Sequence, residues 1–197
     1  MKPRPAATIV VARPGAAGPE VLVLERSGRS RFGPGFAVFP GGSLEPGDDE
    51  LARRWFGDPA EAYRACAVRE LYEEAGILAT AAGLCAEPSG APIESIDFEP
   101  PPPAALPEMA RWIAPEGLPV RFDTRFYAIA APPGLEPVPD GVEIERAWWA
   151  DPAGVLDAAA NGEASLMWPT LVTLRALRAC RSVEDALALR VPQVAPA

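Results

Sequence analysis

The chain contains no histidine, and this absence excludes both a catalytic triad built on histidine and a zinc site with histidine ligands. Cysteine is scarce as well. The three cysteines, Cys66, Cys85 and Cys180, are scattered and lack the spacing of metal ligands, which is typical of reduced thiols in a cytoplasm. The sequence also lacks a signal peptide and any apolar run long enough to cross a bilayer, so we expect a cytoplasmic protein.

Positive charge is in short supply too. With 18 Lys and Arg against 27 Asp and Glu, the net charge is −9, which argues against a general binder of nucleic acid or of anionic membranes. The length of 197 residues suits one domain with a hydrophobic core, and no repeat or linker divides the sequence. We therefore expect a single domain over residues 1–197, with many loops because proline and glycine are frequent.

The apolar patterns predict an α/β fold with strands before and after a central helix. Strands are expected at residues 6–12, 21–26, 36–39, 120–130 and 143–149. Helices are expected at residues 107–113, 169–179 and 182–190, and after Asp151-Pro152. We interpret residues 40–42 as a turn and the proline-dense segment 88–107 as a surface loop.

The central helix is predicted from Pro59 to Ala75. Asp58 is a suitable N-cap, proline suits the first helical position, and Glu61 stands where a capping-box carboxylate belongs. Gly76 supplies the left-handed residue that ends a helix. The residues that share the face expected to be buried are Val68, Leu71, Tyr72 and Ala75.

Three glutamates, Glu70, Glu73 and Glu74, share the opposite face of this helix. Glu70 lies three and four residues from the other two, so each pair repels by about 0.2–0.5 kcal/mol. Glu73 and Glu74 also lie beside the negative end of the helix dipole, which costs about 0.3–1 kcal/mol each. A bound Mg²⁺ or Mn²⁺ would offset this repulsion, because hard cations prefer carboxylate oxygens. A solvated acidic face without a metal is the alternative interpretation.

The residues around these glutamates resemble the Nudix box, the signature of the Nudix hydrolases. Residues 69–77 read Arg-Glu-Leu-Tyr-Glu-Glu-Ala-Gly-Ile, which fits the second half of the box. The first half is interrupted, because Asp48 follows Gly42 at the usual interval but the spacer to the Arg-Glu pair is then too long by 13 residues. Counting backwards, Glu61 stands at the regular place of the first glutamate.

The box is thus split over residues 42–78 by an insertion at about 49–58, and the first-Glu place falls to either Asp48 or Glu61. The stretch before it resembles the upstream signature of the coenzyme A diphosphatase branch of this family. That stretch reads Leu22-Val23-Leu24-Glu25-Arg26-Ser27, then Arg31, Gly35 and Phe39-Pro40-Gly41-Gly42. All spacings and both arginines agree with the signature, whereas Val23 and Leu24 depart from its leucine and threonine. The split box and fragments at 121–126 and 168–170 are similar to the nucleoside diphosphate-linked moiety X motif 19-type enzymes, which act on CoA and acyl-CoA.

The resemblance implies an α/β/α sandwich with a mixed sheet and extra C-terminal helices. It implies hydrolysis of the diphosphate linkage of CoA or acyl-CoA to 3′,5′-ADP and 4′-phosphopantetheine or its acyl form, with Mg²⁺ or Mn²⁺ as cofactor. Two alternatives stay open: another nucleoside diphosphate derivative (ADP-ribose, NADH or a nucleotide sugar), and a Nudix-fold binding module without turnover. The expected partner is a small CoA-like substrate, not nucleic acid or a membrane, and a homodimer is compatible with the sequence.

The same resemblance assigns roles to individual residues. Glu73 and Glu74 would bind the metal, and Glu70 would be a further ligand or the base that accepts the proton of the attacking water. Arg69 would orient a glutamate. The expected substrate-binding residues are Arg26, Arg31, Gly35, Gly41 and Gly42, because arginine forks suit phosphate oxygens and glycines let the backbone approach a ligand closely. Candidates for another carboxylate at the metal are Glu143 and Glu145.

Overall fold

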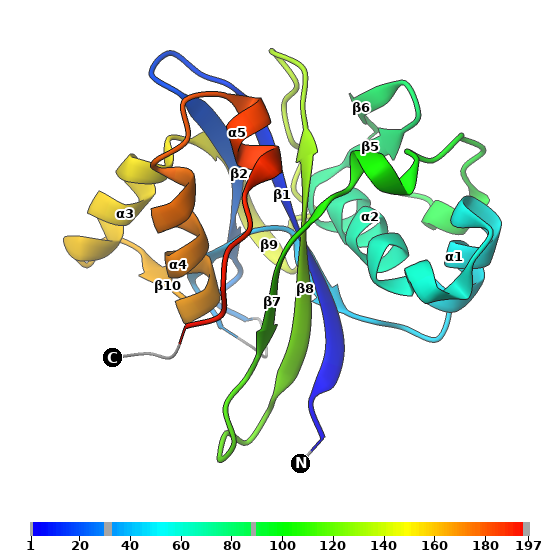
Figure 1. Ribbon diagram of the computed structural model, residues 1–197, viewed down its shortest axis with the longest axis horizontal. Helices are drawn as coiled ribbons and strands as arrows, with labels where there is room; N and C mark the ends of the chain where they lie inside the picture. The colour runs from blue at the N-terminus through cyan, green and yellow to red at the C-terminus, as the bar shows by residue number, and fades with distance from the viewer. Residues whose placement is uncertain (1, 30–32, 88–89, 195–197) are drawn as a thin grey trace.

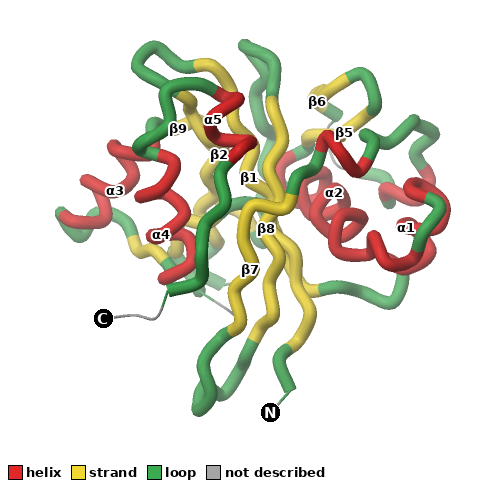
Figure 2. Tube along the Cα trace, in the orientation of Figure 1, coloured by secondary structure: helices red, strands yellow, loops and turns green. Residues whose placement is uncertain are grey.

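The computed structural model describes residues 2–29, 33–87 and 90–194, and its centre is a mixed β-sheet (Figures 1 and 2). Among these residues, eight strands form one sheet in the order β10-β3-β2-β1-β8-β7, with β4 paired to β1 and β9 paired to β2. Strands β5 and β6 form a separate hairpin. The strand bounds are β1 Arg4–Pro14, β2 Pro19–Arg26, β3 Phe36–Val38, β4 Gly41–Ser43, β5 Ile77–Thr80, β6 Gly83–Ala86, β7 Glu108–Ile113, β8 Phe122–Ala130, β9 Ile144–Ala150 and β10 Ser165–Leu166.

The sheet is mixed because two of its pairings are parallel. β1 runs parallel to β8, and β3 runs parallel to β10. The pairings of β1 with β2, β1 with β4, β2 with β3, β2 with β9, and β7 with β8 are antiparallel. The mixed sheet implied by the family resemblance is therefore confirmed.

Helices cover both faces of this sheet (Figure 1). On one face lie α1 (Asp48–Phe56) and α2 (Ala62–Ala75), and on the other lie α3 (Pro152–Ala160), α4 (Trp168–Leu177) and α5 (Val183–Ala188). Three short 3-10 turns cover Pro59–Glu61, Ile93–Ser95 and Pro103–Ala105. The expected α/β/α sandwich with extra C-terminal helices is confirmed.

The side chains of the central strand β1 pack into two hydrophobic clusters, one on each face of the sheet. Ile9 and Val11 pack in the cluster that contains α2, whereas Val10 and Ala12 pack in the cluster that contains the C-terminal helices. All four are at most 1% exposed. Successive side chains of a strand point to opposite faces, so a strand covered on both faces is apolar throughout. The sheet therefore separates the C-terminal helices from the layer that carries the three glutamates.

Two expectations about local structure are wrong, and a third holds only in part. Residues 107–113, expected as a helix, contain strand β7, which pairs along β8 and buries Met109 and Trp112. The segment 40–42, expected as a turn, leads into β4, which pairs with β1. The described part of segment 88–107 is not merely a surface loop, because Ile93 and Leu106 are fully buried in the cluster around α2. Within the described ranges, none of the helices is both long enough and apolar enough to cross a membrane.

Candidate active site

Helix α2, which carries the three glutamates, is fixed at both ends. Asp58 accepts a hydrogen bond from the N–H of Ala60 at 2.8 Å and precedes the 3-10 turn that leads into the helix. At the other end Gly76 has a φ of 61°, and its N–H donates to the carbonyl oxygen of Tyr72. The predicted helix and its glycine end are confirmed, with a first turn in 3-10 form. The expected buried face is confirmed as well, since these residues are at most 2% exposed: Val68, Leu71, Tyr72 and Ala75.

The three glutamates differ sharply in exposure. The side chain of Glu73 is 46% exposed, that of Glu70 is 13% exposed and that of Glu74 is only 6% exposed. The N–H of Gly41 donates to Glu74 Oε2 at 2.9 Å, and Nη1 of Arg26 lies 3.6 Å from Glu74 Oε1. The polar face of α2 is therefore covered by β4 and β2 near Glu74 and is most open to solvent at Glu73.

Arg69 joins two of these glutamates to Asp48. Its Nη1 donates to Glu70 Oε1 at 2.8 Å and to Glu73 Oε2 at 2.9 Å. Its Nε and Nη2 donate to the two carboxylate oxygens of Asp48 at 2.8 and 3.0 Å. Arg69 and Asp48 are 4% and 1% exposed, so this bidentate ion pair is buried. Arg69 thus contacts two of the glutamates that it is expected to orient.

Asp48 lies immediately before the insertion in the box. This residue begins helix α1, and its carboxylate also accepts the N–H of Glu45 at 2.7 Å. Glu61 instead pairs with Arg64, so the expected capping box does not form. Of the two residues considered for the first-Glu place, Asp48 contacts Arg69.

Burial governs the electrostatics of this cluster. Burial raises the pKa of Glu70 and of Glu73, and contacts with Arg69 oppose the rise in both. The pKa of Glu74 is raised well above its ordinary value, first by burial and then by repulsion from Glu70. For Arg69, burial alone would lower the pKa, but the hydrogen bonds to Asp48 and the charge of Glu70 outweigh it and raise the pKa. Burial is thus the first cause that disfavours the charged forms of these glutamates.

The donor chemistry of the cluster fits a hard divalent cation. In the parts of the chain that the structure describes, no three acidic or cysteine side chains form a ready-made metal site. In this arrangement Nη1 of Arg69 contacts one carboxylate oxygen each of Glu70 and Glu73. Carboxylate oxygens nevertheless suit Mg²⁺ and Mn²⁺, and a cation would offset both the burial and the repulsion from Glu70 that raise the pKa of Glu74. We therefore treat Glu70, Glu73 and Glu74 as residues able to hold such an ion.

Two glycines bring β4 directly against neighbouring groups. A Cβ at Gly42 would lie 2.3 Å from Glu70 Oε1, and a Cβ at Gly41 would lie 2.5 Å from the carbonyl oxygen of Ala7. Neither position can carry a side chain without movement of its surroundings. Gly35 has a φ of 73°, the left-handed region that favours glycine. The fifth expected substrate-binding residue, Arg31, lies outside the described residues.

Arg26 links the segment before the box to the glutamates. Its side chain is 16% exposed and lies between two carboxylates, with Nη1 3.6 Å from Glu74 and Nη2 3.4 Å from Glu143. Among the described residues, its buried Nε has no hydrogen-bond partner. Of the two late carboxylates considered as ligands, Glu143 is the one that contacts Arg26.

One residue beside this contact, Asp140, is not among those expected from the sequence. Its carboxylate accepts the backbone N–H groups of Val142, Glu143 and Ile144. An Asp-Gly pair just before a strand is a turn signal, and Asp140-Gly141 could have been found by it.

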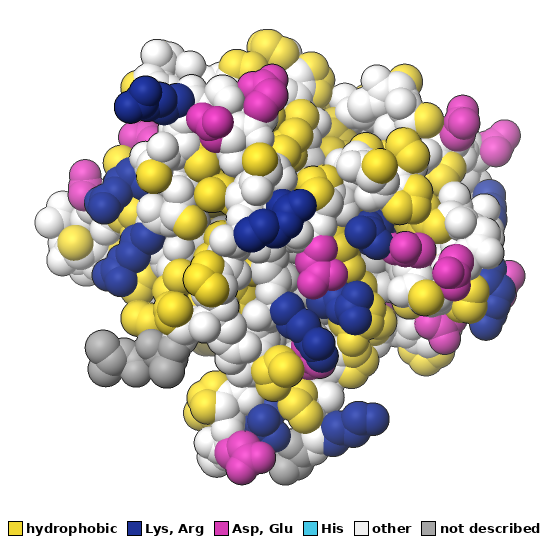
Figure 3. All heavy atoms as spheres, viewed as in Figure 1, with side chains coloured by type: hydrophobic (Ala, Val, Ile, Leu, Met, Phe, Trp, Pro, Cys, Tyr) yellow, Lys and Arg dark blue, Asp and Glu magenta, His cyan; other side chains and the backbone are white. Residues whose placement is uncertain are grey.

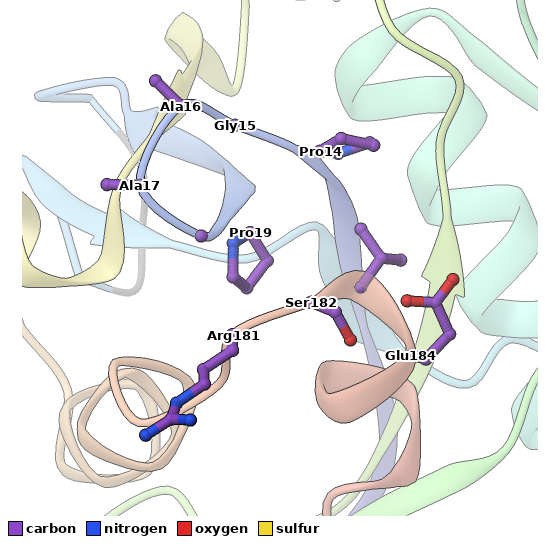
Figure 4. A pocket seen from close by; sticks show the side chains of 10 residues that line it. Pro14, Gly15, Ala16, Ala17, Pro19, Arg181, Ser182 and Glu184 are labelled. Carbon is purple, nitrogen blue, oxygen red and sulfur yellow. The ribbon is translucent and has the colours of Figure 1, made fainter.

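Two other surface features lie apart from the glutamates. A hollow between the β1–β2 turn and the turn before α5 is lined by residues that include Pro14, Pro19 and Arg181 (Figure 4), and no candidate site residue lines it. Over β7 and β8, basic and acidic side chains lie next to each other (Figure 3), as in the ion pair of Arg111 with Asp123.

The chain matches the family model described as the NUDIX domain over residues 2–168. It belongs to the Nudix hydrolase family. Enzymes of this family are diphosphatase-type hydrolases that generally use divalent metals and bind small nucleoside diphosphate substrates. The family resemblance read from the box is therefore confirmed.

The curated relatives include an acyl-coenzyme A diphosphatase. The acyl-coenzyme A diphosphatase NUDT19 of Homo sapiens is 27% identical over 244 residues, which covers 87% of this chain and 64% of that protein. The chain spans less than two thirds of the length of the curated relatives it matches. This Nudix chain is thus distantly similar to an acyl-CoA diphosphatase.

Solved structures confirm the fold. A NUDIX hydrolase from Alicyclobacillus acidocaldarius gives a TM-score of 0.79 at 32% identity, covering 96% of this chain and 98% of that one. The NUDIX domain of Shewanella oneidensis NrtR, complexed with ADP ribose, gives a TM-score of 0.57 at 13% identity, covering 89% of this chain and 86% of that one. The second likeness shows a shared fold alone.

Proposed function

We propose that this protein hydrolyses the diphosphate linkage of CoA or acyl-CoA, releasing 3′,5′-ADP and 4′-phosphopantetheine or its acyl form. The observation that carries the proposal is the position of Arg26, the first arginine of the CoA-type segment, within 3.6 Å of Glu74 in the box. The two motifs that resemble a CoA diphosphatase thus meet at one place in the fold. The similarity to the acyl-coenzyme A diphosphatase NUDT19 supports the same substrate class.

In this proposal Glu70, Glu73 and Glu74 hold one or more Mg²⁺ or Mn²⁺ ions. Such an ion supplies neutralisation of phosphate charge and a lowered pKa for a bound water. Arg69, itself held by Asp48, keeps the carboxylates of Glu70 and Glu73 in place. Water attacks one phosphorus, the bridging P–O bond breaks, and a carboxylate accepts the proton of the water, for which Glu70 is the candidate if it is not a ligand.

Substrate binding falls to the segment before the box. Arg26 and Arg31 would bind phosphate oxygens, since the planar guanidinium fork matches them. The backbone at Gly35, Gly41 and Gly42 would approach the ligand. The same proposal takes residues 1–197 as one Nudix domain.

The departure from the CoA-type signature at position 24 does not favour another substrate. Leu24 is fully buried in the cluster that contains α2, so its side chain serves packing at this position. Cleavage of ADP-ribose, NADH or a nucleotide sugar is therefore an outcome of the test below and not a second proposal.

A substrate panel tests the proposal. The purified protein is incubated with CoA, acetyl-CoA, ADP-ribose and NADH in the presence of Mg²⁺ or Mn²⁺, in H₂¹⁸O, and the products are identified by mass spectrometry. We expect 3′,5′-ADP and 4′-phosphopantetheine from CoA, with ¹⁸O in one product only. Robust cleavage of ADP-ribose without cleavage of CoA would overturn the substrate assignment. An absence of hydrolysis with every substrate would favour the binding module.

A further inference from the structure

The loop between β8 and β9 is anchored on the core before it reaches the candidate site. The carbonyl oxygen of Leu135 accepts hydrogen bonds from Arg13 Nη1 at 3.1 Å and from Trp149 Nε1 at 2.7 Å. Further along, the N–H of Val138 donates at 2.7 Å to the carbonyl oxygen of Ala75, the last residue of α2. The loop is thus fastened to the end of the helix that carries the three glutamates.

Asp140 fixes the last part of this loop. Its Oδ1 accepts the N–H groups of Val142 at 3.1 Å and Ile144 at 2.8 Å, and its Oδ2 accepts the N–H of Glu143 at 3.1 Å. Hydrogen bonds to an ionised acceptor are stronger than neutral ones, so three of them hold this backbone in one conformation. Gly141, between the acceptor and its donors, has a φ of 71°, which lets the chain turn back on the carboxylate.

The pairing of β9 with β2 is irregular near the start of β9. Between Glu25 and Arg26 the register of β2 against β9 shifts by one residue, and Glu145 is the additional residue on β9. The N–H of Ser27 donates to the carbonyl oxygen of Glu143 at 2.8 Å, just before the shift. A bulge next to a site re-aims a side chain. Here it brings Glu143 beside Arg26.

Arg26 is consequently shared between two carboxylates of different character. Glu74 is 6% exposed and Glu143 is 66% exposed, and their oxygens lie at similar distances from the guanidinium, 3.6 and 3.4 Å. Without the second partner, Arg26 would settle on the buried Glu74, where charge attraction is least screened. The guanidinium would then compete with a divalent cation for the same carboxylate.

We infer that Asp140 is a positioning residue for the metal site, because it holds the backbone of Glu143 so that Glu143 keeps Arg26 from pairing fully with Glu74. The inference rests on the proposed function in one respect, namely that Glu74 is a metal ligand. It adds a residue outside the two motifs, acting through the main chain of the loop.

Mn²⁺ binding to the metal-free protein, measured by isothermal titration calorimetry, tests the inference without any substrate. Asp140→Ala removes all three acceptor contacts, and Asp140→Asn keeps one carbonyl oxygen. We expect Asp140→Ala to weaken Mn²⁺ binding about ten-fold, as removal of a group that orients a ligand does, and Asp140→Asn to restore part of the affinity. The matched control is Asp151→Ala, which removes a carboxylate that accepts a backbone N–H at the start of α3 and leaves Mn²⁺ binding unchanged.

A double-variant cycle separates positioning from general destabilisation. If Asp140 acts through Glu143, then Asp140→Ala changes the Mn²⁺ dissociation constant by less than about two-fold when Glu143→Ala is already present. An equal loss in both backgrounds would overturn the inference, as would an unchanged affinity in folded Asp140→Ala. If Asp140→Ala does not fold, the cycle with Asp140→Asn decides by the same criterion.

The two proposals fail in distinguishable ways. Wild-type protein that binds Mn²⁺ but leaves CoA intact contradicts the proposed substrate, while the cycle still tests Asp140. Wild-type protein that binds no Mn²⁺ overturns both the metal assignment and the inference built on it.

Discussion

The buried ion pair between Asp48 and Arg69 provides a direct test of how the interrupted box is held together. Asp48→Ala removes two hydrogen bonds, of 2.8 and 3.0 Å, from a guanidinium that is 4% exposed. It also removes the acceptor for the N–H of Glu45 and an acidic residue from the first turn of α1. Breaking a buried pair by removing one partner costs about 3–5 kcal/mol, since the other charge is left uncompensated.

The structure favours the lower end of that range. Nη1 of Arg69 keeps its contacts with Glu70 and Glu73, so part of the positive charge stays compensated. We therefore expect the free energy of unfolding to fall by about 3 kcal/mol. For a chain of this length, about 2–4 °C is lost per kcal/mol, so the melting temperature should drop by about 6–12 °C.

Urea unfolding followed by tryptophan fluorescence measures this loss, with an unchanged slope against denaturant showing that the transition itself is unaltered. The control is Glu50→Ala, which removes the ion pair with Arg53, whose side chains are 78% and 53% exposed. Exposed pairs contribute at most about 1 kcal/mol. If Asp48→Ala were as mild as Glu50→Ala, the pair would not be what holds α1 to α2, and our account of the insertion would be wrong.

Three further predictions concern the site and the sheet. Gly42→Ala should lower hydrolysis about 10–100-fold, because the added Cβ would lie 2.3 Å from Glu70 Oε1 and displace that carboxylate; steady-state kinetics measure the loss. Glu74→Gln should lower hydrolysis at least about 100-fold and weaken Mn²⁺ binding, as chelation of the metal by EDTA should in the wild type. Arg111 lowers the pKa of Asp123, so their ion pair should stabilise the fold by about 0.2–1 kcal/mol above pH 4. This contribution should be lost as the pH falls through the lowered pKa of Asp123. Urea unfolding of the wild type and of Asp123→Asn from pH 7 to pH 3 measures the difference.

Control variants show whether each effect is specific to the residue that is changed. A Cβ at Gly90 meets nothing within 4 Å, so Gly90→Ala should leave hydrolysis unchanged where Gly42→Ala does not. Glu163→Gln, at an exposed position, should likewise leave Mn²⁺ binding intact. A stability gap between wild type and Asp123→Asn that stayed constant down to pH 3 would contradict the role of Arg111.

The sequence is sufficient for elements whose signals lie within the element itself. The 3-10 turn that leads into helix α2 is capped by Asp58, and the helix has its apolar spacing and its end at Gly76, so the sequence predicts it with nearly correct bounds. The sequence does not predict strand β7, because Met109 and Trp112 are spaced as in a helix. The strand is specified instead by its pairing with β8, a later segment of the chain. Tertiary pairing overrides local preference there.

The candidate site also combines residues that the sequence predicts with contacts that it does not. The glutamates and Arg69 were identified from the spacing of the box, a pattern contained in two turns of one helix. The burial of Glu74 could not be identified, because it depends on Gly41 and Arg26, which come from β4 and β2. Asp140 acts through backbone N–H groups, and such contacts leave only the weak trace of a turn in the sequence.

We propose that the first-Glu place of the box is defined by the contact with Arg69 and not by its distance along the chain. Helix α1 begins at Asp48, and its buried Leu51 and Ala52 pack in the cluster that contains α2. The extra residues therefore follow Asp48 and fold back on the same layer, so the distance between Asp48 and Arg69 in space does not grow with the length of the spacer. A pattern with fixed spacing would select Glu61, which pairs with Arg64 one turn into the helix. An insertion is tolerated at this point because the ion pair that it might have broken is formed by Asp48, which precedes the insertion and begins helix α1.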